Sequence, residues 1–275
     1  MSGLRQEFVQ RSITAICLSA VVVALVLFSP NLILNTFVFL LSLALFFEWM
    51  KVSKASRKKK IIFLLLFSSL ICCILGFGAL LEPIPIITML GITVWIVIAF
   101  QIFFREGRLS SSFSFTNFWI GLILISTFCL TSFQFVNGSR LFLLIAIFNV
   151  AIFDSGAYII GKNFGKNSFL PELSPNKTIE GLIGGLASSI VFVTLLYILI
   201  EEVSLKASIA LMLSIPFALC GDYFFSFLKR KANIKDTGSI LPGHGGLLDR
   251  VDSHLAAIPM TAFFSHLLYM LGSYF

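Results

Sequence analysis

The chain has 275 residues, of which 58% are hydrophobic and only 12% are charged, and its mean hydropathy is +0.99. Soluble domains carry about a quarter charged residues, so this composition excludes a soluble globular domain. It also excludes disordered, collagen-like and disulfide-rich secreted chains, and it predicts an integral membrane protein. The net charge of +7 fits nucleic acid, anionic lipid or the basic bias of cytoplasmic loops, so the positions of the charges must decide between them.

Nine apolar runs are long enough to cross a bilayer, which requires about 20 residues per helix. The sequence therefore predicts an all-α, polytopic fold with about nine transmembrane helices. The first run resembles the apolar core of a signal peptide but lacks a small-x-small cleavage site, so we expect it to be a retained helix. The expected spans are 13–29, 31–50, 61–81, 84–104, 115–135, 140–160, 178–200, 205–225 and 254–274.

The basic residues are divided very unevenly between the two sides that nine spans define. Eighteen of the 20 lysines and arginines fall on the side of the N-terminus, and the other side holds only Arg140 and Lys206. Cytoplasmic loops carry an excess of Lys and Arg. We therefore expect a multi-pass protein of the cell (plasma) membrane with its N-terminus in the cytoplasm and its C-terminus outside. This topology explains the positive charge, so no nucleic-acid partner is expected.

The two halves of the chain differ in polarity. We expect residues 1–140 to form N-terminal transmembrane helices that serve as a scaffold or as the interface of a homodimer. Residues 141–275 are expected to form a catalytic transmembrane domain with two cytoplasmic loops, 161–177 and 226–253. The cysteines lie in apolar runs without the spacing of metal ligands, so we expect buried free thiols. They are Cys17, Cys72, Cys73, Cys129 and Cys220.

Acidic residues stand beside both loops, with Asp154 and Glu180 flanking the first loop and Asp222 preceding the second. A carboxylate at membrane depth is costly unless it meets a cation, a metal or water. Three such residues near one face of the membrane therefore predict a shared polar site. For Glu180 an alternative is open, because a carboxylate in the first turn of a helix is also favoured by the helix dipole.

The second loop combines groups that suit phosphate chemistry. Cations neutralise phosphate oxygens, glycines let backbone N–H groups approach an anion, and carboxylates without thiols suit Mg²⁺. The combination is typical of phosphoryl or nucleotidyl transfer. The chain has neither a GxxxxGK[ST] P-loop nor a GxGxxG after a strand. The groups are Lys229, Arg230, Lys231, Lys235, Asp236, His244, Asp249, Asp252 and the turn 242–246.

Two polar blocks match a known pattern in residue type and spacing. The first is Ser226-x2-Lys229-Arg230-x4-Lys235-Asp236-x-Gly238-x2-Leu241-Pro242-x-His244-Gly245-Gly246-x2-Asp249-Arg250-x-Asp252. It resembles the signature of phosphatidate cytidylyltransferases, also called CDP-diacylglycerol synthases. The second comprises Phe153-Asp154-Ser155-Gly156-Ala157-Tyr158, Gly161-Lys162, Gly165-Lys166 and Ser174-Pro175-Asn176-Lys177-Thr178-x-Glu180-Gly181. It is similar to the family's other polar block, with Ser155 where Thr is commoner. The resemblance covers residues 150–275.

The resemblance implies an enzyme that transfers CMP from CTP to phosphatidic acid, giving CDP-diacylglycerol and pyrophosphate. The implied cofactor is Mg²⁺, and whether a second cation, monovalent or divalent, takes part is left open. The implied partners are CTP, phosphatidic acid and membrane lipids. Since one substrate is a lipid and the other a cytoplasmic nucleotide, the active site is expected on the cytoplasmic face.

The resemblance also implies roles for individual residues. Asp222 and Asp249 are the expected metal ligands, with Asp154 and Asp252 as second candidates or as groups that orient the first pair. His244 could donate to a leaving phosphate or be structural in its turn, and both readings are open. The expected catalytic residues are Asp222, Asp249, Lys229, Arg230, Lys235, His244 and Arg250. The expected substrate-binding residues are Ser174, Asn176, Lys177, Thr178, Glu180, Gly243, Gly245 and Gly246.

Three rival functions are open at this point. A CTP-dependent polyprenol or phytol kinase would share the membrane setting, the nucleotide and the metal, but would transfer the γ-phosphate to an alcohol. A cytidylyltransferase for another lipid phosphate, such as an archaeal ether lipid, would differ only in its lipid recognition. An ion-coupled transporter would place charges near the middle of the bilayer and show paired repeats. The acids here stand at helix ends, and the two halves show no repeat.

Overall fold

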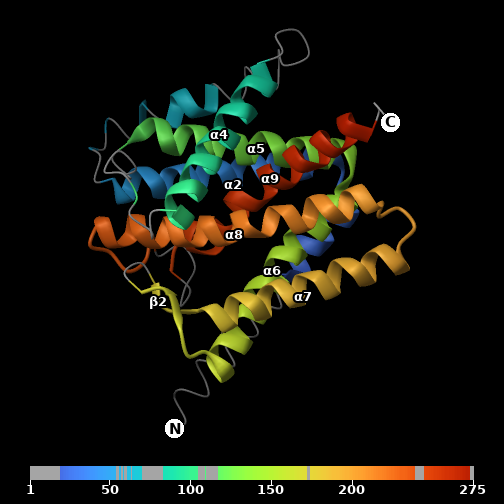
Figure 1. Ribbon diagram of the computed structural model, residues 1–275. Coiled ribbons are helices and arrows are strands. Elements are labelled where there is room, and N and C mark those ends of the chain that lie inside the picture. The colour runs from blue at the N-terminus through green and yellow to red at the C-terminus, as the bar shows by residue number, and fades with distance from the viewer. Residues whose placement is uncertain are drawn as a thin grey trace.

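The protein is an assembly of long apolar helices, seen here in a computed structural model (Figure 1). The structure describes residues 19–53, 56, 58, 61–62, 64–69, 83–104, 109, 117–171, 174–238 and 245–272. Its elements are α2 (Asn31–Val52), α4 (Pro83–Phe104), α5 (Phe118–Gly138), α6 (Arg140–Phe164), β1 (Ser168–Leu170), β2 (Ser174–Thr178), α7 (Ile179–Leu199), α8 (Leu205–Lys231) and α9 (Leu248–Gly272).

Within these described ranges, seven helices are long and apolar enough to cross a membrane, and a shorter apolar helix covers Ser19–Phe28. The predicted all-α, polytopic membrane fold is therefore confirmed. The expected span 13–29 lies partly, and the expected span 61–81 largely, outside the described residues, and the first two residues of 115–135 and the last two of 254–274 also lie outside them. The two described cysteines, Cys129 and Cys220, are buried free thiols as expected, and the other three lie outside the described residues.

Three helices extend well beyond the apolar runs from which they were predicted. Helix α6 continues to Phe164, inside the expected loop 161–177, α8 continues to Lys231, and α9 begins at Leu248. The expected loop 226–253 is therefore shorter, because its basic residues close α8 and its acidic residues open α9. This arrangement is electrostatically favourable, since cations are stabilised at helix C-termini and carboxylates at N-termini.

The loop between α6 and α7 contains the only strands among the described residues. Strands β1 and β2 pair antiparallel, with Ser168 opposite Thr178 and Leu170 opposite Ser174. This hairpin was not predicted. Its strands are three and five residues long and show no alternation of apolar and polar side chains, so no pattern with a period of two was there to be recognised.

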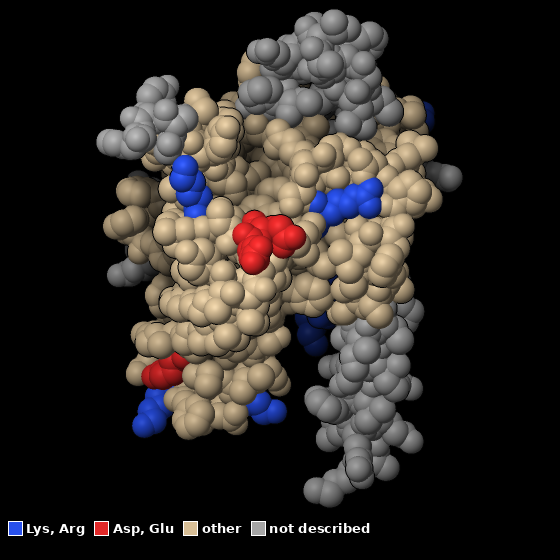
Figure 2. All heavy atoms as spheres, turned by 90° about the vertical axis from the view of Figure 1, so that its right-hand side faces the viewer, with Lys and Arg blue, Asp and Glu red and all other residues tan. Residues whose placement is uncertain are grey.

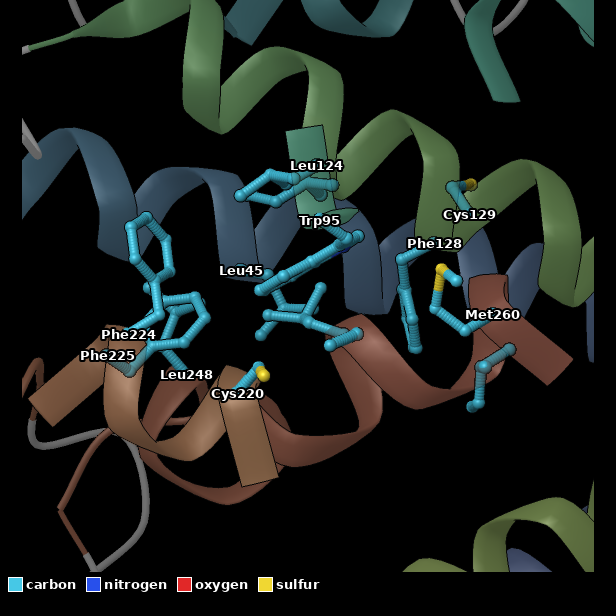
Figure 3. Packing of buried hydrophobic residues seen from close by; sticks show 14 of the residues in the cluster. Leu45, Trp95, Leu124, Phe128, Cys129, Cys220, Phe224, Phe225, Leu248 and Met260 are labelled. Atoms are coloured by element: carbon cyan, nitrogen blue, oxygen red, sulfur yellow. The ribbon is translucent and has the colours of Figure 1, made fainter. Parts of the chain in front are cut away.

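One apolar core joins helices from both halves of the chain. Leu45 of α2, Trp95 of α4, Phe128 of α5, Phe224 of α8 and Met260 of α9 lie in the same cluster (Figure 3). The rings of Trp95 and Phe224 meet edge to face with their centroids 5.8 Å apart. The division at residue 140 into two domains stays a prediction, and the apolar core continues across it.

Helices α8 and α9 approach closely at a glycine. A Cβ atom on Gly221 would collide with the backbone carbonyl oxygen of Asp252, so a residue without a side chain is needed at this crossing. The close approach brings Asp222, the next residue of α8, toward Asp252 of α9. The packing of the two helices thus prepares the site.

Charged residues are sparse at the end of the bundle that holds the turn between α7 and α8. Figure 2 shows this end, where most of the described surface is uncharged and the charged side chains form small separate patches. Glu201, Glu202 and Lys206 are exposed in and just after the turn. The polar residues of the candidate site lie toward the other end, beside β2 (Figure 1).

Candidate active site

A cavity of about 750 Å³ lies among α6, β2, α7, α8 and α9. Its wall combines a polar part with apolar side chains such as Phe153, Leu182 and Leu219. Nine of the predicted site residues line it, from both polar blocks of the sequence. They are Asp154, Ser174, Asn176, Lys177, Thr178, Asp222, Asp249, Arg250 and Asp252.

The four aspartates reach the cavity from three helices. Asp154 lies well inside α6 and Asp222 about two thirds of the way along α8, so neither stands at the helix end where it was expected. Asp249 and Asp252 lie in the first turns of α9. Asp252 lies close enough to Asp222 and Asp154 for an electrostatic interaction with both carboxylates. Carboxylates gathered in this way repel one another unless cations lie between them, so the arrangement favours the entry of a cation.

Lys177 of β2 is the cation beside this acidic cluster. Its ammonium group forms an ion pair with Asp222 and lies 4.3 Å from the centre of the Tyr223 ring. The hairpin thus carries a positive charge into a wall that is otherwise made by helices. Lys162, 5.7 Å from the Tyr158 ring, and Arg250 are the other cations of the lining.

Asp249 is tied to its surroundings through both oxygens. Its Oδ1 accepts from the Lys229 ammonium group at 2.9 Å. Its Oδ2 accepts from the backbone N–H of Thr237 at 2.8 Å, the Thr237 hydroxyl at 3.0 Å and the N–H of Gly246 at 3.0 Å. Asp249 therefore faces the cavity and also fixes the segment before α9, and Lys229 acts on the site through Asp249.

The lining fits a hard divalent cation that is completed by substrate. No three Asp, Glu, His or Cys side chains among the described residues form a ready-made metal site. Mg²⁺ does not require one, because it is usually held by one or two protein carboxylates together with substrate phosphates and water. The four aspartates of the lining exceed its three cations, Lys162, Lys177 and Arg250, by one negative charge.

Several predicted residues do not line the cavity. Arg230 and Lys235 are exposed outside it. Gly245 adopts a φ of +81° beside Asp236, a conformation that suits glycine. The N–H of Gly246 is used by Asp249, so it is not offered to a phosphate in this arrangement. Gly243 and His244 lie outside the described residues, and the roles of all these residues stay predictions.

Glu180 lies at the start of α7 and holds the residues that follow α6. Its carboxylate accepts from the backbone N–H groups of Lys166 and Asn167 at 3.0 and 3.2 Å, and from the Asn167 side chain at 2.9 Å. It does not line the cavity. This geometry supports the helix-end alternative for Glu180, and its assignment to substrate binding stays a prediction.

Replacing Glu180 with Gln is expected to loosen the hairpin while leaving the helices folded. The amide group keeps one acceptor oxygen and turns an NH₂ group toward donors, so at least one of the three hydrogen bonds is lost. Hydrogen exchange should become faster in peptides that contain Lys166 and Asn167. Glu201→Gln, an exposed change at the other end of α7, is the control. Equal exchange in both variants would show that Glu180 does not hold this segment.

The pattern of the sequence missed some residues of the site. Lys162 stands in the quoted block but was given no role, and Tyr158, Tyr223 and Ser253 also line the cavity. Spacing alone could not separate these aromatic side chains from lipid-facing ones. Glu48 of α2 contacts the segment before α9. It was missed because it stands alone in an apolar run, away from both polar blocks.

A model described as the cytidylyltransferase family matches residues 9–268. The chain belongs to this family. Among similar proteins, phosphatidate cytidylyltransferase of Bacillus subtilis (strain 168) is 43% identical over 113 residues, which are 40% of this chain and 42% of that protein. The protein of that name from Staphylococcus haemolyticus (strain JCSC1435) is 42% identical over 122 residues, 43% of this chain and 46% of that one. The phosphatidate cytidylyltransferase of Staphylococcus aureus (strain COL) is 38% identical over 149 residues, which are 49% of this chain and 57% of that protein.

The matched segments span about half the length of these curated relatives. The family model covers both polar blocks and also the N-terminal helices, beyond the stretch from residue 150 in which the sequence resemblance was recognised. In this member of the family the two blocks, which are separated in the chain by most of α7 and most of α8, face each other across one cavity.

Proposed function

We propose that this member of the cytidylyltransferase family transfers CMP from CTP to phosphatidic acid, giving CDP-diacylglycerol and pyrophosphate. The observation that carries the proposal is the single cavity in which four aspartates, three cations and an apolar wall meet. Such a lining suits a lipid with an anionic head group and a nucleotide with its metal. The relatives are named phosphatidate cytidylyltransferase, which supports the same reaction.

The reaction is a displacement at phosphorus. An oxygen of the phosphatidate phosphate forms a bond to the α-phosphorus of CTP, the bond from that phosphorus to the oxygen of the β-phosphate breaks, and pyrophosphate leaves. The attacking oxygen is anionic near neutral pH, so it needs little help from a general base. The main barrier is the repulsion between two anions, which positioning and electrostatic neutralisation reduce.

The chain's own residues divide this work. Lys177 and Arg250 lie in the lining and can bind phosphate oxygens, with Lys162 as a third cation. Ser174, Asn176 and Thr178 of the hairpin offer hydroxyl and amide groups that orient a polar ligand. Lys229 holds Asp249 in place. The apolar part of the wall excludes water from one side of the reacting groups.

The aspartates fit Mg²⁺, which when bound would neutralise charge on the phosphates. Asp222 and Asp249 are the proposed ligands, and Asp154 and Asp252 are candidates to join or orient them. A second cation is compatible with four carboxylates in one lining. Lys177 pairs with Asp222 and Lys229 with Asp249, so a bound ion would share each of these carboxylates with a lysine.

We also propose the orientation that the basic residues indicate, with the N-terminus and the cavity on the cytoplasmic side. Labelling of single engineered cysteines in sealed cells tests it. A cysteine at Lys235 should be protected from an impermeant reagent, and one at Glu202 should react. The reverse pattern would overturn the orientation. The buried residues of α2 and α5 support a scaffold role for the N-terminal helices, and a homodimer interface there stays a proposal.

The central assay follows both products of the reaction. Purified protein in detergent with CTP, Mg²⁺ and phosphatidic acid should form a CMP-bearing lipid and release pyrophosphate in equal amounts. A lipid kinase would release CDP and leave no CMP on the lipid. A transporter would form neither product. Absence of the CMP-lipid with Mg²⁺ and phosphatidic acid present would overturn the proposed function.

A further inference from the structure

Glu48 is a buried carboxylate in a helix that contributes nothing to the polar signature. It lies near the C-terminal end of α2, and only 1% of it is exposed. A carboxylate buried without partners is strongly unfavourable. The groups that contact Glu48 therefore indicate what it does in this protein.

The hydrogen-bond partners of Glu48 lie in the segment around the start of α9. Its Oε1 accepts from the backbone N–H of Leu247 at 2.9 Å, and its Oε2 accepts from the N–H of Leu248 at 2.8 Å. The first N–H groups of a helix have no partner within the helix, and the helix dipole favours an anion there. Glu48 thus supplies from α2 the anionic cap of α9.

Asp249, at the start of the same helix, accepts backbone hydrogen bonds from different donors than Glu48 does. Thr237 contacts both carboxylates. The Thr237 hydroxyl is 3.2 Å from Oε2 of Glu48 and 3.0 Å from Oδ2 of Asp249. Thr237 is only 3% exposed. A hydroxyl has one hydrogen, so it donates to one carboxylate at a time while staying in contact with both. A shift of Glu48 therefore disturbs the contacts of Asp249.

Two glycines leave the space that Glu48 occupies. A Cβ atom on Gly238 or on Gly246 would overlap the Glu48 carboxylate. Because neither residue has a side chain, the Glu48 carboxylate fits between Gly238 and Gly246. Glu48 itself is not among the residues that line the cavity, so it touches the site only through this segment.

We infer that Glu48 is a positioning residue: it fixes the start of α9 and thereby the placement of Asp249 and Arg250 in the cavity. The inference rests on the proposed function for its kinetic consequences. It assigns to the N-terminal helices a direct part in ordering the active site, in addition to any role as a scaffold.

Glu48→Gln tests the inference with almost no change of shape. The NH₂ group of Gln must face a backbone N–H or the Thr237 hydroxyl, so at least one hydrogen bond is lost. Loss of a group that orients a metal ligand typically costs about 10- to 100-fold in activity or metal affinity. We expect kcat to fall in this range and the Mg²⁺ concentration for half-maximal activity to rise. The KM for phosphatidic acid should change less than about twofold, since Glu48 contacts no substrate.

Matched variants separate positioning from general destabilisation. Ser42→Ala removes a fully buried polar group from the same helix, where its Oγ donates to the Val38 carbonyl at 2.8 Å, and it should keep wild-type kinetics. Glu48→Asp keeps the charge and should restore part of the rate. Thr237→Val removes the hydroxyl that contacts both Glu48 and Asp249 but leaves every residue of α2 unchanged. It should change kcat and the Mg²⁺ dependence in the same direction, and it serves as the second variant if Glu48→Gln does not fold.

The outcomes are distinct. If Glu48→Gln and Thr237→Val match Ser42→Ala in kcat and in Mg²⁺ dependence, the inference is wrong. It is also wrong if activity falls only in proportion to the folded fraction. If the wild type forms no CMP-lipid, the proposed function fails, and hydrogen exchange then tests Glu48 by itself. Peptides containing Leu247 and Leu248 should exchange faster in Glu48→Gln than in Ser42→Ala, and equal exchange would overturn the anchoring role.

Discussion

Asp222→Asn is expected to lower kcat by about 10³-fold, the upper range for loss of one hydrogen-bonding group that stabilises a transition state electrostatically, because a lost metal ligand should cost at least as much. The substitution keeps the shape of the side chain but removes the negative charge that faces Lys177 and the cavity. A metal ligand would be weakened, and the Lys177 charge would lose its partner. The measurement is CMP-lipid formation by purified protein at saturating CTP and Mg²⁺.

The control for this variant is Glu202→Gln, an exposed change at the opposite end of the bundle, which should keep full activity. The thermal midpoint of Asp222→Asn should fall less than that of Asp249→Asn, because the side chains of Lys177 and Asp222 are 28% and 29% exposed, against 19% and 7% for Lys229 and Asp249. A residual rate above about a tenth of wild type corresponds to less than ~1.4 kcal/mol of barrier. Such a rate would show that Asp222 does not hold the metal.

Asp249→Asn is expected to damage both activity and structure. Only 7% of the Asp249 side chain and 19% of the Lys229 side chain is exposed, so the substitution leaves a half-buried ammonium group without its carboxylate. Breaking a buried pair in this way costs about 3–5 kcal/mol, and the partial exposure of Lys229 places the effect at the low end of that range. We expect a drop in kcat of at least about 100-fold and a lower thermal midpoint.

Lys229→Met shows whether the lysine works through Asp249. If it does, the double variant with Asp249→Asn should be little worse than Asp249→Asn alone, because residues that act as a unit are not additive. Additive losses would mean that Lys229 contacts substrate independently. A normal thermal midpoint for Asp249→Asn would contradict its role in fixing the segment before α9.

The sequence was sufficient for the membrane fold and for the grouping of the two polar blocks, since hydropathy reports spans directly and carboxylates are costly inside them. It was less informative about helix ends. Hydropathy marks the part of a helix that meets lipid, whereas α8 continues to Lys231 because cations are favourable at its C-terminus. Asp249 and Asp252 are helical for the corresponding reason at the start of α9.

Contacts between segments that are distant in the sequence could not be predicted from residue patterns. Lys177 could be assigned to substrate binding from its block, but its pairing with Asp222 depends on a short hairpin without a periodic signal. Glu48 is the one acidic residue of the expected span 31–50 and was given no role in the sequence analysis. Only the packing of α2 against the start of α9 gives it partners, and no local rule predicts that packing.

The cap that α2 provides for α9 has a consequence for how the protein is made. Glu48 is synthesised 199 residues before Leu247 and 200 before Leu248, so α2 leaves the ribosome long before its partners exist. Domains in general fold as units once their chain is available. The N–H groups that bind Glu48 are made only after α8, so the C-terminal end of α2 reaches its final packing late in synthesis.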